Sequence, residues 1–598
     1  MWKFKKIEAG IPERNPHESE FFRLTNPAEA VVREFIQNAL DARSSNGIHV
    51  RIYFGVADHQ GVSQFLDGLQ PHLSACNFGN LSLCDNISYL VLEDFETTGL
   101  NGDTKWPSDS NFSKFWHGEG TSLKRGRMAG RWGLGKTTFH MISNIRTFFG
   151  FTVRNDNPCQ LLMGKALLRT HRLNGDMYNY TGYFTQENWE PVNDSQMINE
   201  FKKTFNINRG DAPGLSIVIL LPQKEITYDN VLRAVMTQYF YAIIAGMVKV
   251  EIEESERRIT LDKDTLISTA LGLRWVGTDW ENVDLREILN FVKSSVENTN
   301  LLELSILDPA NPEITQSSFS NLAGLKEQFR GGEGCHFKVP VIIKTSNGSQ
   351  LRSFYKIHLK RFQHLKKALE FYMRSGILIY ETKTLGIKPI ISLLIADEEP
   401  VAMFLGDCET PAHTDWNERT EGFKDKYENA TRILRFIKNS VRDLVSILDE
   451  VPSQRLIDFL KEIFSIPVAA EKSEKEGEKT KTRPNTIPPP KEPLFNISSV
   501  MRGFTVTLNP KKTNIAFPLR ALLKIAYDTR RGNPFKQYET FDFNLNNAPI
   551  IVTPQNCRIL SKKPNELEIE ITGAGFKLKV TGFDPSRDIV VNAMEIKP

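Results

Sequence analysis

The stretch from Asn26 to Arg43, NPAEAVVREFIQNALDAR, predicts the helix around which the chain is organised. Asn26 is a favourable N-cap, Pro27 suits the first helical position, and Glu29 has the spacing of a capping box. Apolar residues then recur at helical spacing and form a stripe for a core: Val32, Phe35, Ile36, Ala39 and Leu40.

Three polar side chains of this helix fall on one line. Glu34, Asn38 and Asp41 stand at positions i, i+4 and i+7, so they point the same way. A carboxylate, a carboxamide and a second carboxylate suit a site that needs a base, a ligand for a hard cation and a further polar anchor. The alternative is an ordinary amphipathic helix with a solvated polar edge, which is commoner for such a helix taken alone.

Composition places the chain among soluble globular proteins. It has 598 residues, 40% hydrophobic and 25% charged, with a formal net charge of +3. The length predicts about four domains, and the small net charge gives no global field for nucleic acid. There is no apolar run long enough for a membrane helix, no secretory signal and no CxxC pair among the six cysteines. We therefore expect a cytoplasmic protein without a membrane partner.

Two further segments carry chemistry. The apolar run Tyr89–Leu92 ends in Glu93-Asp94, and an acid at the end of such a strand commonly holds a polar group of a ligand. A long polar segment follows, typical of a mobile lid, and it closes on the glycine-rich stretch 130–138. A glycine-rich turn that opens a helix exposes backbone N–H groups to phosphate oxygens, and Lys136 would add a positive charge.

The same stretch has a second interpretation. Residues Gly130 to Thr137 satisfy the P-loop pattern G-x-x-x-x-G-K-[ST], which predicts an NTPase that depends on Lys136. However, the preceding residues HGEGTSLKRGRMA are not an apolar strand, and no Walker-B aspartate follows at a natural distance. We keep the P-loop as an alternative that would leave Glu34 and Asp94 dispensable.

Together with strands expected at 147–154, 160–168 and 214–221, these segments predict an α/β sandwich over residues 1–225 that resembles the GHKL ATPases. That family includes gyrase B-type subunits, ninety-kilodalton heat-shock chaperones, histidine kinases, MutL and MORC proteins. Glu34 to Asp41 resembles its N box, Asp94 to Gly99 its adenine box, Gly133 to Lys136 a glycine box, and Gly214-Leu215-Ser216 its late GT motif. Glu96 replaces the first glycine of the adenine box, which predicts a rebuilt loop around Thr97–Gly99 or a looser fit to adenine.

The resemblance implies ATP and Mg²⁺ as cofactors in a Bergerat-type domain. Glu34 would be the general base, Asn38 the magnesium ligand and Asp94 the acceptor for the adenine amino group. The remaining nucleotide contacts would come from Asp41, Thr98, Gly99, Gly133, Leu134, Gly135, Lys136, Thr137 and Ser216. Phosphoryl transfer to water depends mostly on positioning and charge neutralisation, with roughly 10²- to 10⁴-fold from the base.

The rest of the chain predicts three parts. Residues 226–468 resemble the transducer domain of GHKL hydrolases, whose cation for the γ-phosphate would be Arg374, with Lys356 and Lys360 as alternatives; the basic stretch 356–367 could also contact phosphates of nucleic acid. Residues 469–493 are a charged, proline-rich linker. Residues 494–598 predict an antiparallel β-sandwich for docking, in which strands 567–571 and 576–580 pair as a hairpin.

The sequence thus predicts an α+β protein and a Mg²⁺-dependent ATPase whose nucleotide state drives a conformational change through homodimerisation. A non-hydrolysing nucleotide-binding scaffold that recruits a partner through the β-sandwich is the second hypothesis. DNA or a partner protein would be the stimulating partner. By analogy with the resembling proteins alone, we rank anti-phage defence or DNA transactions first.

Overall fold

The computed structural model confirms a mixed α+β fold in two compact units, residues 1–465 and 466–598. Each unit is described by itself. The structure describes all residues except 8–25, 80–84, 106, 119–136, 277, 279, 282, 366, 381, 387, 411–413, 421, 450–493, 501, 511, 513–514, 528–533, 541, 585–586, 588 and 597–598. The predicted linker 469–493 therefore lies outside the described residues.

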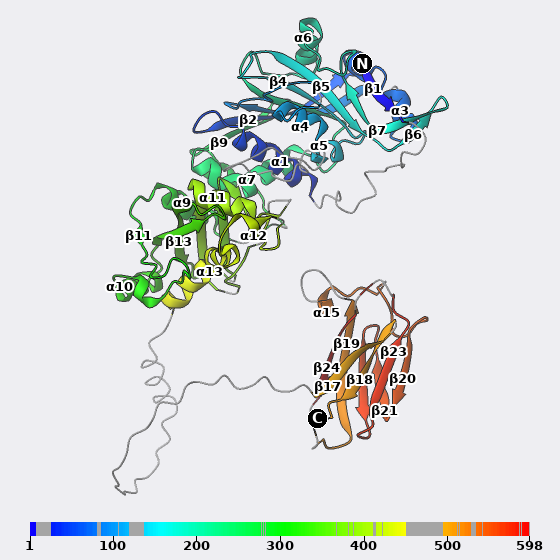
Figure 1. The fold of residues 1–598 in the computed structure, drawn as a ribbon, viewed down its shortest axis with the longest axis vertical. Helices are drawn as coiled ribbons and strands as arrows, with labels where there is room; N and C mark the ends of the chain where they lie inside the picture. Colours follow the sequence, from blue (N-terminus) through cyan, green and yellow to red (C-terminus); the bar gives the residue numbers. More distant parts are fainter. Residues whose placement is uncertain are drawn as a thin grey trace. The chain divides into compact units, whose positions relative to one another are not determined.

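A ten-stranded sheet forms the first half of the first unit (Figure 1). Its strands run in the order β1 (Trp2–Lys6), β7 (Asp176–Phe184), β5 (Gln160–Leu167), β4 (Thr147–Val153), β8 (Gly214–Leu220), β3 (Asn86–Phe95), β2 (Ile48–Asp58), β9 (Val248–Glu254) and β10 (Arg257–Leu261), and β6 (His171–Leu173) pairs with β7. The neighbours are antiparallel except for β2 and β9, which run parallel.

Helices cover both faces of this sheet, which explains why β3 is a nearly continuous buried run. Leu90 and Leu92 face the cluster that contains α1 (Pro27–Asp41), α4 (Asn111–His117), α5 (Thr137–Met141) and α7 (Tyr228–Ile244). Tyr89 and Val91 face α2 (His59–Leu66), α3 (Gln70–Ala75) and α6 (Ser195–Thr204). The predicted cap of α1 is present, because the Asn26 side chain accepts a hydrogen bond from the Glu29 amide at 3.3 Å.

The domain boundary predicted after residue 225 is too early. Strand β9 continues the first sheet by pairing with β2, and α7 packs beside α1 (Figure 1). The same hydrophobic cluster extends from α1 and α7 to Phe371 and Leu393 of a second sheet. The first and second sheets therefore share a core within one unit.

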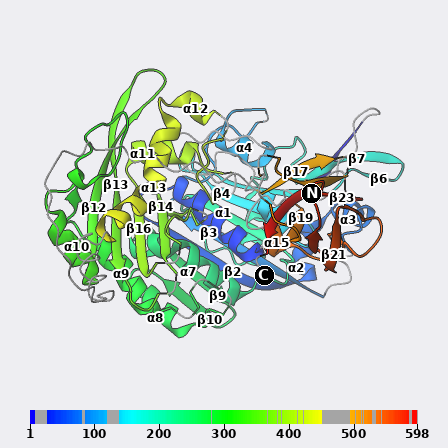
Figure 2. The same cartoon turned by 90° about the horizontal axis from the view of Figure 1, so that it is seen from below.

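The second sheet has six strands in the order β11 (Leu302–Glu303), β12 (Cys335–Lys344), β13 (Gln350–Arg361), β16 (Ile390–Ala396), β14 (Leu369–Arg374) and β15 (Ile377–Leu378). One face packs on α7, α8 (Leu266–Gly272) and α9 (Leu285–Glu297), beside α1 (Figure 2). The other is covered by α10 (Leu322–Arg330), α11 (Glu399–Asp407), α12 (Phe423–Lys426) and α13 (Ala430–Asp449), with a 3₁₀ turn at Gln316–Ser318.

Strands β14 and β15 form a tight hairpin. Ser375 and Gly376 both have positive φ, 49° and 87°, as a two-residue turn between β14 and β15 requires. A Cβ placed on Gly376 would lie 3.7 Å from Leu40 of α1. The turn therefore packs against the helix that carries the predicted site.

Two four-stranded antiparallel sheets form the second unit around one hydrophobic cluster. One sheet has β17 (Phe495–Val500), β18 (Gly503–Leu508), β23 (Lys577–Thr581) and β20 (Ile551–Gln555); the other has β21 (Cys557–Lys562), β22 (Glu566–Ile571), β19 (Leu519–Tyr527) and β24 (Ile589–Glu595), and α15 spans Pro534–Gln537. The hairpin predicted between 567–571 and 576–580 is wrong, because β22 and β23 belong to different sheets and pair with other strands.

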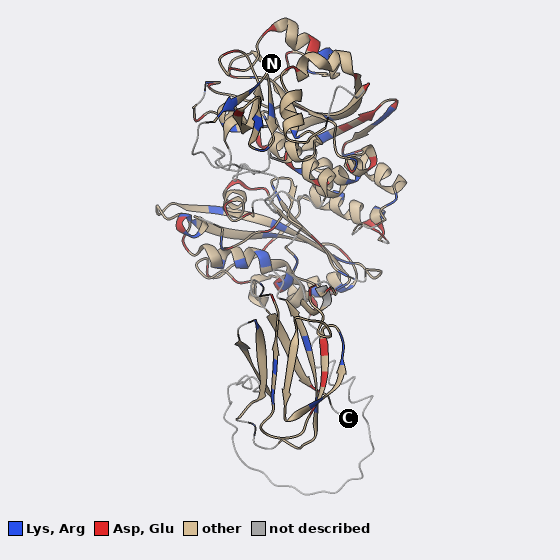
Figure 3. Cartoon of the chain, turned by 90° about the vertical axis from the view of Figure 1, so that its right-hand side faces the viewer, with Lys and Arg blue, Asp and Glu red and all other residues tan. Residues whose placement is uncertain are grey.

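Charged residues of both signs are interspersed along the ribbon of each unit in Figure 3. This agrees with a formal net charge of only +3. Among the helices that the structure describes, none is long and apolar enough to cross a membrane.

Candidate nucleotide site

The polar row of α1 has the geometry that its spacing predicted. The amide nitrogen of Asn38 donates hydrogen bonds to the Glu34 carbonyl oxygen, at 2.8 Å, and to Glu34 Oε1. Both side chains are half-buried beside the apolar stripe. Because the Asn38 nitrogen is turned toward Glu34, its amide oxygen is turned away, and such an oxygen is a ligand that Mg²⁺ accepts.

Asp94 stands at the end of β3, on the face of the sheet that α1 covers, and is only 4% exposed. Its Oδ1 atom accepts hydrogen bonds from the Leu215 amide at 2.8 Å and from Thr97 Oγ1 at 2.7 Å, and Arg209 lies 3.7 Å away. No described residue donates a hydrogen bond to Oδ2. One oxygen is thus held by the protein, and the other is left for a ligand.

The loop after Asp94 is tied to the C-terminal end of α1. The Ser44 amide donates to the Glu96 carbonyl, and the Thr98 amide donates to the Ala42 carbonyl, both at 2.9 Å. Glu96 has φ of 63°, a left-handed conformation that normally favours glycine, and its side chain is exposed. Glu96 thus adopts a backbone conformation that favours glycine and has an exposed side chain, and the looser fit to adenine stays a prediction.

Two glycines allow the close contacts of this site. A Cβ on Gly214, where φ is 146°, would lie 2.6 Å from Asp94 Oδ1, and a Cβ on Gly99, where φ is 68°, would lie 2.9 Å from Thr152 Oγ1. Contacts below 3.0 Å are not found for real Cβ atoms, so both positions need glycine. Gly214 therefore gives the room in which the Asp94 carboxylate sits.

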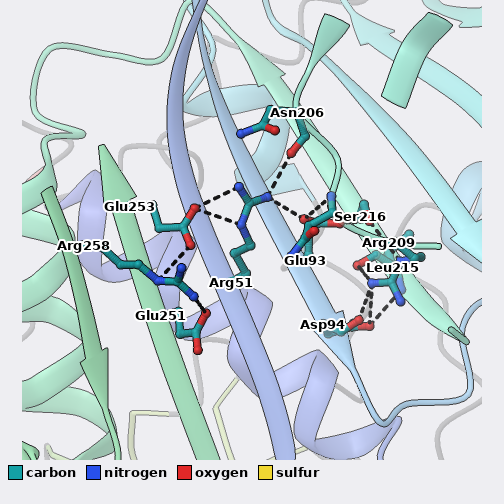
Figure 4. Close-up of polar contacts among 11 residues, drawn as sticks. Arg51, Glu93, Asp94, Asn206, Arg209, Leu215, Ser216, Glu251, Glu253 and Arg258 are labelled. Atoms are coloured by element: carbon teal, nitrogen blue, oxygen red, sulfur yellow. Dashed lines mark hydrogen bonds and ion pairs between the residues drawn. The ribbon is translucent and has the colours of Figure 1, made fainter. Parts of the chain in front are cut away.

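Ser216 lies on the opposite face of the sheet from this carboxylate, with Arg209 between the two side chains (Figure 4). Its hydroxyl donates to Glu93 Oε1 at 2.9 Å and accepts from Arg209 Nε at 3.1 Å. Ser216 and Glu93 are register partners on β8 and β3, on the face opposite to α1. The predicted contact of Ser216 with adenine is thus replaced by an indirect link to Asp94 through Arg209.

A charged network fixes the strands behind the site (Figure 4). Arg51 of β2 donates to Glu93 Oε2 at 2.8 Å and to Glu253 Oε2 of β9 at 2.9 Å. The guanidinium is buried, and Glu93 has no exposed surface. These bonds join three neighbouring strands at the level of Asp94, which limits movement of the carboxylate.

The predicted phosphate role of Arg374 does not fit the structure. The Arg374 guanidinium and the Glu409 carboxylate are both 0% exposed and form a two-pronged ion pair, with Nη2 and Oε2 2.8 Å apart. The charges of Glu409 and Asp41 raise the pKa of Arg374 against the effect of burial. Arg374 is therefore held by Glu409 in a buried ion pair, and the Asp41 charge at the end of α1 also acts on its guanidinium.

The alternative cations are placed differently. Lys360 pairs with Glu287 at 3.2 Å, and Lys356 lies on the face of the second sheet opposite to the cluster that α11 covers. Lys383, which follows β15, is exposed. Its loop starts beside α1, because the Arg33 guanidinium lies over the Tyr380 ring, 5.1 Å from its centroid.

Four predicted phosphate ligands, Gly133, Leu134, Gly135 and Lys136, lie outside the described residues, as does the P-loop candidate before Thr137. Thr137 begins α5, which has five residues. No family model matches the chain, and no curated protein matches it. The geometry of α1 and of the end of β3 is therefore the basis for assigning a function to this chain.

Proposed function

We propose that residues 1–449 form a Mg²⁺-dependent ATPase of the GHKL type, with a Bergerat-type nucleotide domain and a transducer-like second sheet. The observation that carries the proposal is the half-satisfied carboxylate of Asp94. It is almost fully buried, its Oδ1 accepts two hydrogen bonds from the protein, and its Oδ2 accepts none from the described residues. Oδ2 can therefore still accept a hydrogen bond from a ligand, and the amino group of adenine would supply the donor.

Asp94 and Glu34 are far apart in the sequence, but hydrogen bonds tie the loop after Asp94 to the end of α1. The Ser44 amide donates to the Glu96 carbonyl, and the Thr98 amide donates to the Ala42 carbonyl. A nucleotide with its base at Asp94 could therefore extend its phosphates along the polar row of α1. Mg²⁺, when bound between the phosphates and the amide oxygen of Asn38, would neutralise phosphate charge.

Glu34 would then orient and deprotonate the attacking water. Its hydrogen bond from Asn38 fixes the position of Oε1 relative to the magnesium ligand. A positioned base contributes roughly 10²- to 10⁴-fold to such a reaction. We further propose that ATP binding drives dimerisation of the first unit, with DNA or a partner protein as the stimulating partner in defence or DNA maintenance.

The decisive test compares steady-state ATP hydrolysis with Mg²⁺ for the wild type and Glu34→Ala, together with ATP binding for both. Glu29→Ala, on the first turn of the same helix, is the matched control. We expect Glu34→Ala to bind ATP but to hydrolyse it at least about a hundredfold more slowly. Normal hydrolysis by Glu34→Ala would refute the mechanism. Binding without turnover by the wild type would favour the scaffold hypothesis instead.

A further inference from the structure

Arg209 is a buried cation to which sequence reasoning assigned no role. It lies between α6 and β8, and its side chain has no exposed surface. The guanidinium donates to the main-chain oxygens of Ala212, Pro213 and Leu215 at 3.0–3.1 Å, and to that of Asp94. The chain thus wraps its own carbonyl groups around one cation at the point where β8 begins.

The position of Arg209 is fixed from two further sides. Its Nε donates to the Ser216 hydroxyl at 3.1 Å, and its guanidinium carbon lies 4.6 Å from the centroid of the Phe95 ring. Together with the carbonyl groups, these contacts hold Nη2 at 3.7 Å from Asp94 Oδ1. The arginine therefore approaches only the carboxylate oxygen that is turned away from the proposed ligand.

The charges around Asp94 make this cation important. Burial raises the pKa of Asp94, the Glu93 charge raises it further, and the Arg209 charge lowers it. On α1 and just after it lie the acids Glu34 and Asp41 and the cations Arg33 and Arg43, and none of these is among the main influences on the pKa of Asp94. Among the charges that act on Asp94, Arg209 is therefore the one that favours the ionised carboxylate.

The ionisation state matters for the base that is recognised. An ionised carboxylate only accepts hydrogen bonds, so it suits the 6-amino group of adenine and repels the 6-oxo group of guanine. A protonated carboxyl group can donate, and would tolerate guanine. We propose that Arg209 is a positioning residue that holds Asp94 ionised and oriented, and so makes the site select adenine over guanine. This inference rests on the proposed ATP site.

The test uses the full chain and measures equilibrium binding of ATP and GTP between pH 6 and 9. The variants are Arg209→Met, Arg209→Lys and Thr97→Val, which removes a neutral donor to the same Oδ1. We expect Arg209→Met to lose ATP affinity about tenfold or more at pH 7, to regain it as the pH rises, and to discriminate less against GTP. Arg209→Lys should keep most of the discrimination. Thr97→Val should change the pH profile in the same direction as Arg209→Met but by a smaller amount, because the Thr97 hydrogen bond also lowers the pKa of Asp94, less than the Arg209 charge does.

The outcomes separate this inference from the proposed function. If the wild type binds no adenine nucleotide, the proposed function fails and the role of Arg209 fails with it. If the wild type binds ATP but Arg209→Met has an unchanged pH profile and ATP-to-GTP ratio, the role of Arg209 alone is refuted. Circular dichroism checks each variant for folding, and Arg209→Gln replaces Arg209→Met if the latter does not fold.

Discussion

Replacing Glu409 by glutamine tests the buried ion pair between Arg374 of β14 and Glu409. The change keeps the size of the side chain but leaves the Arg374 guanidinium charged and fully buried without its ion-pair partner. Breaking a buried ion pair in this way costs about 3–5 kcal/mol. Because Asp41 also acts on Arg374, we expect the lower end of this range, about 3 kcal/mol.

Urea unfolding followed by tryptophan fluorescence gives a direct readout. All eight tryptophans precede residue 417, so the signal reports only on the first unit. Trp416 is itself buried and donates a hydrogen bond to Glu409 at 3.4 Å. The expected result is a lower unfolding midpoint with an unchanged slope.

The matched control is Glu418→Gln, which removes a two-pronged partner from Arg435, a side chain that is 65% exposed. Solvent screens such a pair, so the midpoint should not change measurably. The double variant Arg374→Met/Glu409→Met removes both buried charges and should recover most of the lost stability. A midpoint for Glu409→Gln equal to that of Glu418→Gln would refute the reasoning.

Three other perturbations follow from the same structure. Gly214→Ala should abolish nucleotide binding, because its Cβ would enter the space of the Asp94 carboxylate, whereas Gly210→Ala, in the loop before β8, has open space and should bind normally; equilibrium ATP binding compares them. Burial lowers the pKa of His358 to about 3, below its ordinary value of 6.5. The fold therefore has its full stability above pH 6.5, where His358 is neutral in both the folded and the unfolded chain. As the pH falls below 6.5, the free energy of unfolding should decrease by about 1.4 kcal/mol per pH unit. Between pH 6.5 and 5, the free energy of unfolding measured with urea should depend less on pH in His358→Phe than in the wild type. An equal dependence in the two proteins would contradict the role given to His358. Tyr241→Phe removes a 2.6 Å hydrogen bond to a buried carboxylate and should lower the free energy of unfolding by about 1–3 kcal/mol, unlike a surface tyrosine.

Local patterns predicted the parts of the site that depend on neighbours in the sequence. The row of Glu34, Asn38 and Asp41 follows from the period of a helix, and in the structure its first two members are hydrogen-bonded to each other. Asp94 was found because an acid ends an apolar run. The α+β class followed in the same way from the alternation of helical and strand patterns.

Contacts between distant segments could not be predicted. Arg209 meets Asp94 across 115 positions of sequence, and no spacing rule connects them. Arg374 was expected at a phosphate because it is a cation in the right domain, but its partner Glu409 lies in a loop without a recognisable pattern. Alternation also identified β22 and β23 as strands while giving no information on which strands they would pair with.

Glu96, which replaces the first glycine of the adenine box, shows a different limit of prediction from sequence. A motif comparison treats Glu96 as a departure, whereas in the structure Glu96 adopts a left-handed backbone conformation, which glycine adopts readily. The energetic cost of such a residue is of the order of 1–3 kcal/mol, and it is offset by the hydrogen bonds that tie the loop to α1. The sequence alone could not show whether this loop lacks the glycine-like conformation or keeps it at the cost of strain.

The most direct test of the central claim is calorimetric titration of the full chain with ATP and Mg²⁺, for the wild type and for Asp94→Asn. Asparagine has the same shape, but its amide presents a neutral group to the base in place of the ionised carboxylate. We predict one ATP bound per chain in the wild type and a loss of affinity of about tenfold or more in Asp94→Asn. Equal affinities for the two proteins, or no binding to the wild type, would contradict the assignment of this site.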